Sequence, residues 1–401
     1  MKKIILILII CFLASPLHLF ADDEKEESSP FRMKDRTIEI GLANISFGFA
    51  NDFLTTSQIL QDKVVINLRE LDKGFRFNLD LDVTPFYFSY NNNNDWGFGL
   101  AVGTDVAGAF DFSGNMLSFS EGKKEKSDVS AAVFIDVKAS SFFPILNFKT
   151  KANLSVFYPA IYVEPNISYS LANPKNGASE IDLLYQIKVF TPMSMADGAS
   201  SSLTSAPGVD IHLGVEYPLS EVLGLNQIIP FLDFIVGVDL INIPIVPSSM
   251  KDYMEISGRI NSNGPIKIDD FEDYMEINED EYYSKKTNIT RPFKMLAWAD
   301  WKPFPSIPVS FIPTIGFAIN PMYSEPGSME GGIKARFDLA NIFIATLGTG
   351  YHDRLWKNSI DLALNLRVFE LNLGVDFRSQ DFAKSWTGGG FGLKFGLKFG
   401  G

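Results

Sequence analysis

The chain has 401 residues, 46% of them hydrophobic, and a formal net charge of −13. This acidic balance disfavours a nucleic-acid partner, because surfaces that bind nucleic acid are strongly basic. The length fits either two or three soluble domains or one large barrel, so the periodicity of the strands has to distinguish between them.

The first 21 residues have the composition of a secretory signal peptide. Lys2 and Lys3 precede an apolar run over 4–20, and Ala21 stands directly before an acidic stretch. This order predicts cleavage after Ala21; the alternative is a retained anchor helix, since the run is close to the shortest that spans a bilayer. Cys11 is the only cysteine and lies within this run, so we expect a mature chain without disulfides or thiol chemistry. Without Lys2 and Lys3 the formal net charge becomes −15.

Residues 22–36 are charged and contain proline. We expect them to form a periplasmic lead-in. A small plug inside a barrel is the alternative, but the segment offers little apolar material for packing.

Beyond the signal, the dominant pattern has a period of two. From Phe75 to Val83 every second residue is apolar, and from Phe391 to Phe399 Phe and Leu alternate with Gly and Lys. On a strand this places the apolar side chains on one face. No apolar run in this part of the sequence approaches the length of a transmembrane helix.

The length of the alternating stretches favours a membrane barrel over a soluble sandwich. Several extend over 10 residues or more, such as 96–112 and 359–368, whereas sandwich strands are mostly about five or six residues long. Gly and Ala are frequent on the less apolar face, which is typical of a barrel whose outer surface contacts lipid. Aromatic residues near presumed strand ends predict interfacial girdles; they are Tyr87, Tyr90, Trp96, Tyr351, Trp356 and Trp386. The predicted fold class is therefore all-β, a single transmembrane antiparallel β-barrel over 37–401.

Sixteen stretches are candidate strands: 37–50, 63–70, 74–90, 96–112, 128–140, 150–168, 180–190, 208–218, 231–241, 289–301, 309–319, 332–340, 342–351, 357–368, 370–379 and 388–399. Because bacterial barrels usually have an even number of strands, we expect 14, with 16 as the alternative. The longest connections, 191–207 and 242–288, are then predicted to be extracellular. The connection 113–127 is long for the periplasmic turn that this count makes it.

The predicted loop 242–288 contains an acidic repeat. Asp252-Tyr253-Met254-Glu255-Ile256 recurs as Asp273-Tyr274-Met275-Glu276-Ile277. We expect this loop to fold over the pore mouth or to contact a partner, with Asp252, Tyr253, Asp273 and Tyr274 as candidate contact residues. Calcium binding by the carboxylates is the alternative, but no EF-hand spacing is present.

Ionisable residues on the polar face are expected to point into the lumen, because a charge that faces lipid costs a few kcal/mol. The candidate lumen-facing residues are Arg76, Asp80, Asp210, His212, Glu216, Arg367, Asp376, Lys394 and Lys398. The same face carries Asp82, Asp105, Asp136, Asp239, Arg336, Asp338, Asp361 and Arg378. Inside a barrel, such charges either set the ion preference of a pore or pair and fill the lumen.

Catalytic motifs are absent from the sequence. It contains no H-E-x-x-H, no G-x-S-x-G and no P-loop, so we expect neither an enzyme nor a cofactor or metal. His212 alternates with Asp210 and Glu216, which permits an acid/base pair in the lumen, but a plain lining residue is the simpler interpretation. His352 is expected to lie at the end of a loop.

With these strands and the final stretch 388–395 in view, the chain resembles outer-membrane β-barrels of spirochaetes. It is more distantly similar to FadL-type transporters of long-chain fatty acids, which implies 14 strands and an N-terminal plug. Two features depart from the pattern: Gly401 follows Phe399 by two residues where such barrels commonly end in an aromatic, and 22–36 contains no recognisable hatch. No site residue can be carried over from the family.

Together these features predict a protein of the outer membrane, inserted by the barrel-assembly machinery and surrounded by lipid. The first hypothesis is a passive pore or FadL-like channel for small polar or hydrophobic solutes. The second is a surface adhesin or structural barrel that binds a partner through 242–288. An outer-membrane hydrolase is the third.

Overall fold

The computed structural model describes residues 37–51, 74–92, 96–113, 126–164, 167–168, 180–192, 205–224, 233–263, 275–277, 281–304, 306–323, 326–366, 368–386 and 390–401. The predicted signal peptide, the lead-in and the candidate strand at 63–70 lie outside these residues. No helix in the described ranges is long and apolar enough to cross a membrane.

Fourteen antiparallel strands form a closed ring. Ring strands β1 and β19 close it, pairing from Glu39–Gly400 to Phe49–Phe391. The ring strands are β1 (Ile38–Asn51), β2 (Gly74–Asn92), β3 (Trp96–Ser113), β4 (Lys126–Ile145), β5 (Phe148–Val163), β8 (Gly208–Tyr217), β9 (Asp233–Val246), β13 (Phe293–Lys302), β14 (Val309–Ile319), β15 (Gly327–Leu339), β16 (Phe343–His352), β17 (Leu355–Leu366), β18 (Phe369–Ser379) and β19 (Gly390–Gly400). The predicted fold class and the expected number of 14 strands are confirmed.

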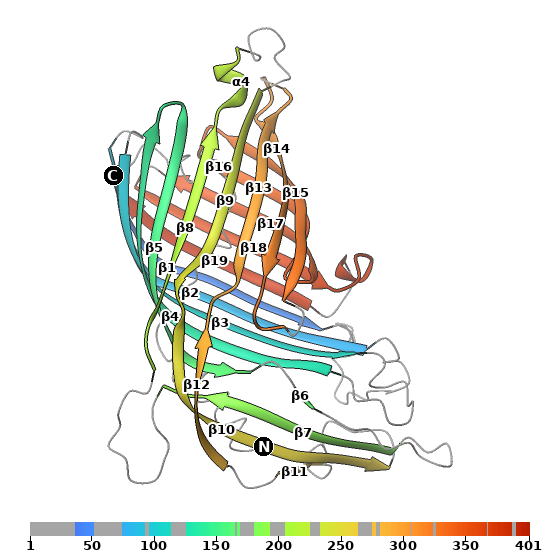
Figure 1. Ribbon diagram of the computed structural model, residues 1–401. Coiled ribbons are helices and arrows are strands. Elements are labelled where there is room, and N and C mark those ends of the chain that lie inside the picture. The colour runs from blue at the N-terminus through green and yellow to red at the C-terminus, as the bar shows by residue number, and fades with distance from the viewer. Residues whose placement is uncertain are drawn as a thin grey trace.

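Five further strands lie outside the ring and extend it at one end (Figure 1). They are β6 (Ile167–Ser168), β7 (Glu180–Phe190), β10 (Ser248–Asn263), β11 (Met275–Ile277) and β12 (Glu281–Ile289). β10 pairs with β7, β11 and β12. We call β7, β10, β11 and β12 the extension.

Both chain ends of the ring lie together, since the backbone N–H groups of Thr37 and Ile38 donate to the carbonyl of Gly401. We call this the terminal end; it also carries the short helix α4 (Leu219–Val222) (Figure 1). The opposite loop end carries the connections 52–73, 114–125, 164–207, 247–292, 320–326, 353–354 and 380–389. The last of these contains the 3₁₀ helix η3 (Lys384–Trp386).

The strand count corrects two sequence predictions. The ring passes directly from β1 to β2, which pair from Ile38–Tyr90 to Asn51–Phe77, and 180–190 is a strand of the extension. Each of these two differences changes by one the number of every connection that follows it. The connection 113–127 thereby becomes the third of the ring and lies at the loop end, together with the other long connections. A period of two shows that one face of a strand is apolar but not which neighbour pairs with it, and for that reason β7 was indistinguishable from a ring strand.

The segment 242–288, predicted as a long loop, consists largely of strands in its described residues. Residues 242–246 complete β9, and β10, β11 and most of β12 occupy much of the remainder. Met254, Ile256 and Gly258 are buried and alternate with Glu255 and Ser257. The alternation was present in the sequence, but the acidic residues around it indicated a solvated run.

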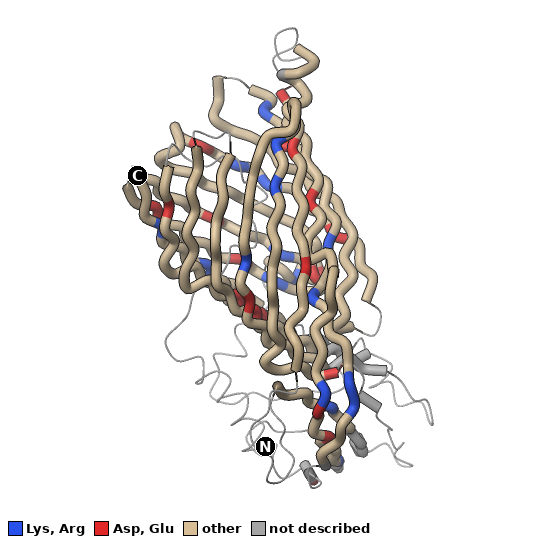
Figure 2. The backbone as a smooth tube through the Cα atoms, turned by 60° about the vertical axis from the view of Figure 1, so that its left-hand side comes forward, with Lys and Arg blue, Asp and Glu red and all other residues tan. Residues whose placement is uncertain are grey.

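The outer face of the ring is apolar and the inner face is small or polar. On β19, Phe391 and Leu393 are exposed while Gly390 and Gly392 are buried. The same alternation places Phe98 and Leu100 outward on β3. Charged residues occur on many strands along the height of the barrel (Figure 2).

The aromatic girdles are largely where the sequence predicted them. Tyr90 and Trp96 lie together at the terminal end, with ring centroids 5.4 Å apart, and Tyr351 and Trp356 lie together at the loop end, also 5.4 Å apart. Tyr87 differs, because its ring lies over Gly41 and near Lys398. A register shift between Val83 and Phe86 separates it from the outward-facing alternation before it.

Candidate functional site in the barrel lumen

A cavity of about 290 Å³ is enclosed by the ring. Its lining residues come from strands all around the barrel, including Asp82 on β2, Lys138 on β4, His212 on β8 and Lys394 on β19. Charges of both signs line it, and Leu296 is one of its few apolar side chains. The cavity is therefore a polar compartment inside an apolar outer surface.

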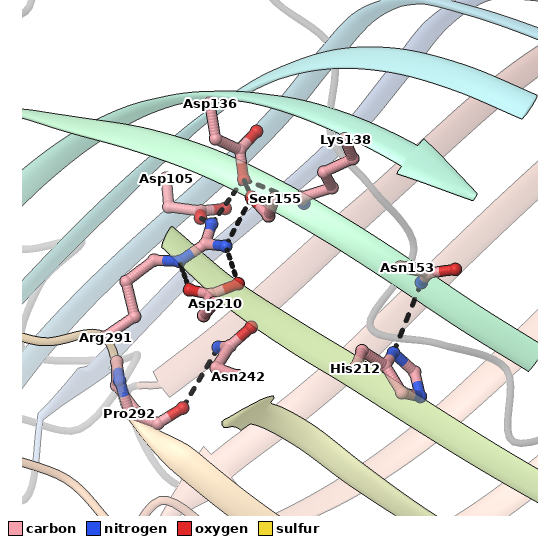
Figure 3. Close-up of polar contacts among 10 residues, drawn as sticks. All are labelled: Asp105, Asp136, Lys138, Asn153, Ser155, Asp210, His212, Asn242, Arg291 and Pro292. Carbon is pink, nitrogen blue, oxygen red and sulfur yellow. Dashed lines mark hydrogen bonds and ion pairs between the residues drawn. The ribbon is translucent and has the colours of Figure 1, made fainter. Parts of the chain in front are cut away.

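The largest polar cluster surrounds Arg291, which belongs to the connection between β12 and β13 (Figure 3). Its guanidinium donates to both carboxylate oxygens of Asp210, at 2.7 Å and 2.8 Å. It also donates to Asp136, to Asp105 at 3.3 Å and to the hydroxyl of Ser155 at 2.6 Å. One side chain thus joins β3, β4, β5 and β8. Bidentate contacts between arginine and carboxylate are among the strongest hydrogen bonds in proteins.

Local backbone features turn Arg291 inward. The ladder between β9 and β13 ends at the pair Ile241–Lys294. Beyond it, Asn242 has a positive φ of 54° and donates its side-chain amide to the carbonyl of Pro292 at 3.0 Å. Pro292 has no N–H for a ladder, so the chain leaves the wall here and Arg291 enters the lumen.

A second polar chain crosses four neighbouring strands nearer the terminal end. Asn153 on β5 contacts Nδ1 of His212 at 3.3 Å, and Nε2 of His212 lies 3.0 Å from Asp239 on β9. Trp298 on β13 donates its indole N–H to Asp239 at 2.9 Å. His212 therefore pairs with Asp239, while the side chains of Asp210 and Glu216 contact Arg291 and Lys149.

A third cluster lies at the seam where β1 meets β19. Arg378 on β18 is fully buried and bonds Asp376 on its own strand and Asp80 on β2. Between them its side chain passes Gly392 on β19 and Gly48 on β1, where a Cβ atom would overlap the guanidinium. Only glycine leaves the space that this close approach requires.

The remaining predicted lumen residues are in ion pairs or outside the described side chains. Lys394 lies 3.5 Å from Asp361, and Lys398 lies 3.7 Å from Glu370. Of the nine candidates, His212, Asp376 and Lys394 line the cavity. Arg367 lies outside the described residues, and the side chain of Arg76 is not described.

Of the four candidate loop contacts, two lie within the described residues and two lie outside them. Asp252 and Tyr253 lie on β10, and the ring of Tyr253 packs between Phe190 and Tyr283, at 5.1 Å and 5.4 Å between centroids. Asp273 and Tyr274 lie outside the described residues. Within the described part of the chain, no group of three or more His, Cys, Asp or Glu side chains is placed to hold a metal ion.

An apolar layer lies on the loop-end side of the Arg291 cluster. It is formed by Ala132, Phe134, Phe157, Tyr162, Phe190, Met250, Ile289 and Met322, each at most 7% exposed. Phe134 and Phe157 make an edge-to-face contact, with centroids 5.7 Å apart. The guanidinium of Arg291 lies 4.9 Å from the ring of Phe157, so the apolar layer rests directly on the Arg291 cluster.

Sequence analysis did not identify Arg291, Met322 or Tyr323. A signal for the first was present, because Pro292 follows Arg291 within the stretch predicted as strand 289–301, and proline interrupts a sheet ladder. Nothing in the local sequence marks Met322 and Tyr323, since their contacts are with residues 192 and 245 positions away.

No protein family matches the sequence, and no curated protein matches it either. Among solved structures, the fold is similar to the toluene transporter TodX of Pseudomonas putida, with 10% identity, a TM-score of 0.45 and coverage of 95% of this chain and 93% of that chain. The toluene transporter TbuX of Ralstonia pickettii has 10% identity, a TM-score of 0.47 and coverage of 92% and 90%. A FadL homologue of Pseudomonas aeruginosa has 10% identity, a TM-score of 0.41 and coverage of 90% and 88%.

Proposed function

We propose that this chain is a passive channel of the outer membrane for small solutes. The observation that carries the proposal is the closed ring with apolar side chains outside and a charge-lined cavity inside. An outer surface of Phe, Leu and Ile is stable against acyl chains, whereas the inward charges avoid lipid. Insertion by the barrel-assembly machinery belongs to this proposal.

The proposed orientation places the terminal end in the periplasm and the loop end outside the cell. The longest connections and the extension all lie at the loop end. Outer-membrane barrels have short periplasmic turns and longer extracellular loops. A solute from outside then meets the apolar layer before it reaches the cavity.

A solute from outside meets the apolar layer before the polar cavity, and this order favours a hydrophobic or amphipathic solute. A strongly hydrated solute has to lose water in order to cross side chains such as Phe134, Phe157 and Met250, which costs free energy that no polar partner there restores. An apolar solute does not pay this cost. The toluene transporters named above carry solutes of this class; for this chain it is a proposal.

A surface that binds a partner is the second candidate. On the outer strand β12 a run of side chains from Tyr282 to Lys286 is exposed. The ring of Tyr253 is already packed between two aromatic neighbours, so β12 offers more accessible contacts than the predicted pair Asp252 and Tyr253.

Uptake into liposomes tests the channel. The mature chain, refolded into lipid vesicles, is expected to accelerate entry of a labelled long-chain fatty acid relative to protein-free vesicles, and to accelerate entry of a hydrophilic sugar much less. Faster entry of the sugar alone would contradict the proposed solute class. Failure to accelerate either solute, with the barrel correctly inserted, would contradict the channel itself.

A further inference from the structure

The connection between β14 and β15 folds into the lumen. Its residues Asn320–Tyr323, which we call the strap, form an internally bonded turn. The side-chain oxygen of Asn320 accepts from the N–H of Met322 at 3.0 Å. The backbone carbonyl of Asn320 accepts from the N–H of Tyr323 at 3.2 Å. Asparagine side chains stabilise such turns by bonding the backbone two residues on. The strap therefore has a defined shape of its own.

The strap reaches the opposite wall of the barrel. Ser130 on β4 donates its hydroxyl to the carbonyl of Met322 at 2.6 Å, and Asn78 on β2 donates its amide to the hydroxyl of Tyr323 at 2.9 Å. In ring order, six strands separate β2 from β14 in either direction. A connection that touches the far side of a closed ring has to cross its interior.

The side chain of Met322 packs the strap against the apolar layer. Met322 is 3% exposed and belongs to the layer that contains Phe134 and Phe157. Tyr323 is 5% exposed, and the guanidinium of Arg354 lies 4.4 Å from its ring. The strap is therefore part of the apolar layer on the loop-end side of the cavity.

We propose that the strap is the gate of the channel: its withdrawal from the lumen removes Met322 from the apolar layer and admits solute to the cavity. This inference rests on the proposed channel function. It states which part of the channel moves. While the strap is in the lumen, Met322 occupies the position through which an apolar solute would pass.

Two observations identify the strap as the part that moves. Its bonds to the far wall are between neutral groups, whereas Arg291, which also enters the lumen from a connection, bonds three carboxylates. Charge-assisted hydrogen bonds are roughly twice as strong as neutral ones. In addition, β14 and β15 stay paired up to Ile319–Gly327, so the strap can leave the lumen without breaking any ladder.

A chemical crosslink tests the closed position. Cys11 lies in the predicted signal peptide and no other cysteine is present, so the pair S130C and M322C is unambiguous in the mature chain. A short thiol-reactive crosslinker across this pair is expected to reduce conductance in planar bilayers and fatty-acid uptake at least tenfold. Each single-cysteine variant treated in the same way should be unaffected. Equal activity of the crosslinked and untreated barrels would overturn the gate.

Removal of the strap tests the open state. Replacing 320–326 by Asn-Gly supplies the two-residue turn that closes a hairpin between Ile319 and Gly327, and conductance is expected to rise at least tenfold. N78L combined with S130A should also raise the conductance. T150A is the matched control, because Thr150 donates to the carbonyl of Phe143 at 2.6 Å away from the strap.

The outcomes separate the gate from the channel. If wild type and the strap-less barrel conduct and transport equally well, the gate is wrong and the channel stands. If neither conducts ions nor transports fatty acid, although both run as folded barrels on unheated gels, the proposed function fails and the gate fails with it.

Discussion

Two buried arginines, Arg291 and Arg378, have opposite roles in this barrel. Arg378 belongs to a ring strand and stays close to the wall, where it connects β18 to β2 across the closing seam. Arg291 belongs to a connection and reaches from it into the lumen to bond four consecutive ring strands. The first links strands across the seam that closes the ring, and the second links four strands from within the lumen.

The partners of the two arginines differ in their access to water. The side chains of Asp136 and Asp210 are 1% and 4% exposed, whereas Asp80, the distant partner of Arg378, is 38% exposed. Arg378 therefore has one buried carboxylate partner, Asp376 at 2% exposure, whereas Arg291 has two besides the more exposed Asp105. Water can therefore replace Arg378 more readily than Arg291, since an unpaired charge is most costly where no water reaches it.

The largest expected effect follows from R291M. Removing one member of a buried ion pair typically costs about 3–5 kcal/mol, because the remaining charges are left unpaired. We expect a loss of this size in the free energy of unfolding, measured by urea titration of the detergent-refolded barrel with tryptophan fluorescence. D105N is the control: its carboxylate is 31% exposed and 3.3 Å from Arg291, so the loss should be below about 1 kcal/mol. Losses of equal size would contradict the difference in burial.

R378M is expected to cost less, about 1.5–3 kcal/mol, the usual range for hydrogen bonds to charged groups. The same urea titration measures it. G48A should destabilise the barrel by forcing the guanidinium aside, and less so when R378M is already present. G108A is the matched control, because the nearest atoms to a Cβ there are 3.9 Å away. Additive effects of G48A and R378M would show that the seam does not depend on this approach.

The smallest effect on stability is expected from K394M. Lys394 pairs with Asp361 at 3.5 Å and lines the cavity, so we expect a loss of about 1 kcal/mol or less. Its main consequence is electrical: the cavity lining loses one positive charge, and the preference for cations should rise. The reversal potential of the strap-less barrel in a KCl gradient measures this shift. A shift toward anions would contradict the assignment of Lys394 to the conduction path.

Sequence periodicity predicted the ring strands well because the alternation within each strand shows which of its faces contacts lipid. The alternation of Phe391, Leu393 and Phe399 with small or basic residues predicted β19, and it is the pattern the structure shows. The same reasoning predicted Arg378, Asp105 and Asp136 on the polar face. It did not predict their partners, since pairing depends on register and on residues far away in the chain.

The two connections that enter the lumen were missed for a related reason. Arg291 was placed in a strand, and Asn320–Tyr323 was an unmarked turn between two strands. Their contacts lie across the barrel, with strands that periodicity treats as independent of them. The acidic repeat had the opposite effect: its charge indicated a loop at 242–288 where alternation at Met254 and Ile256 continues a strand.

The amino-acid sequence alone determined that these strands are apolar on one side and long enough to cross a membrane, because burial against lipid repeats every second residue along each strand. Only the tertiary structure decided which connections turn inward, which carboxylates surround Arg291 and where the strap ends. Those contacts join residues that are far apart in the chain, and they depend on how the closed ring places its strands around one lumen.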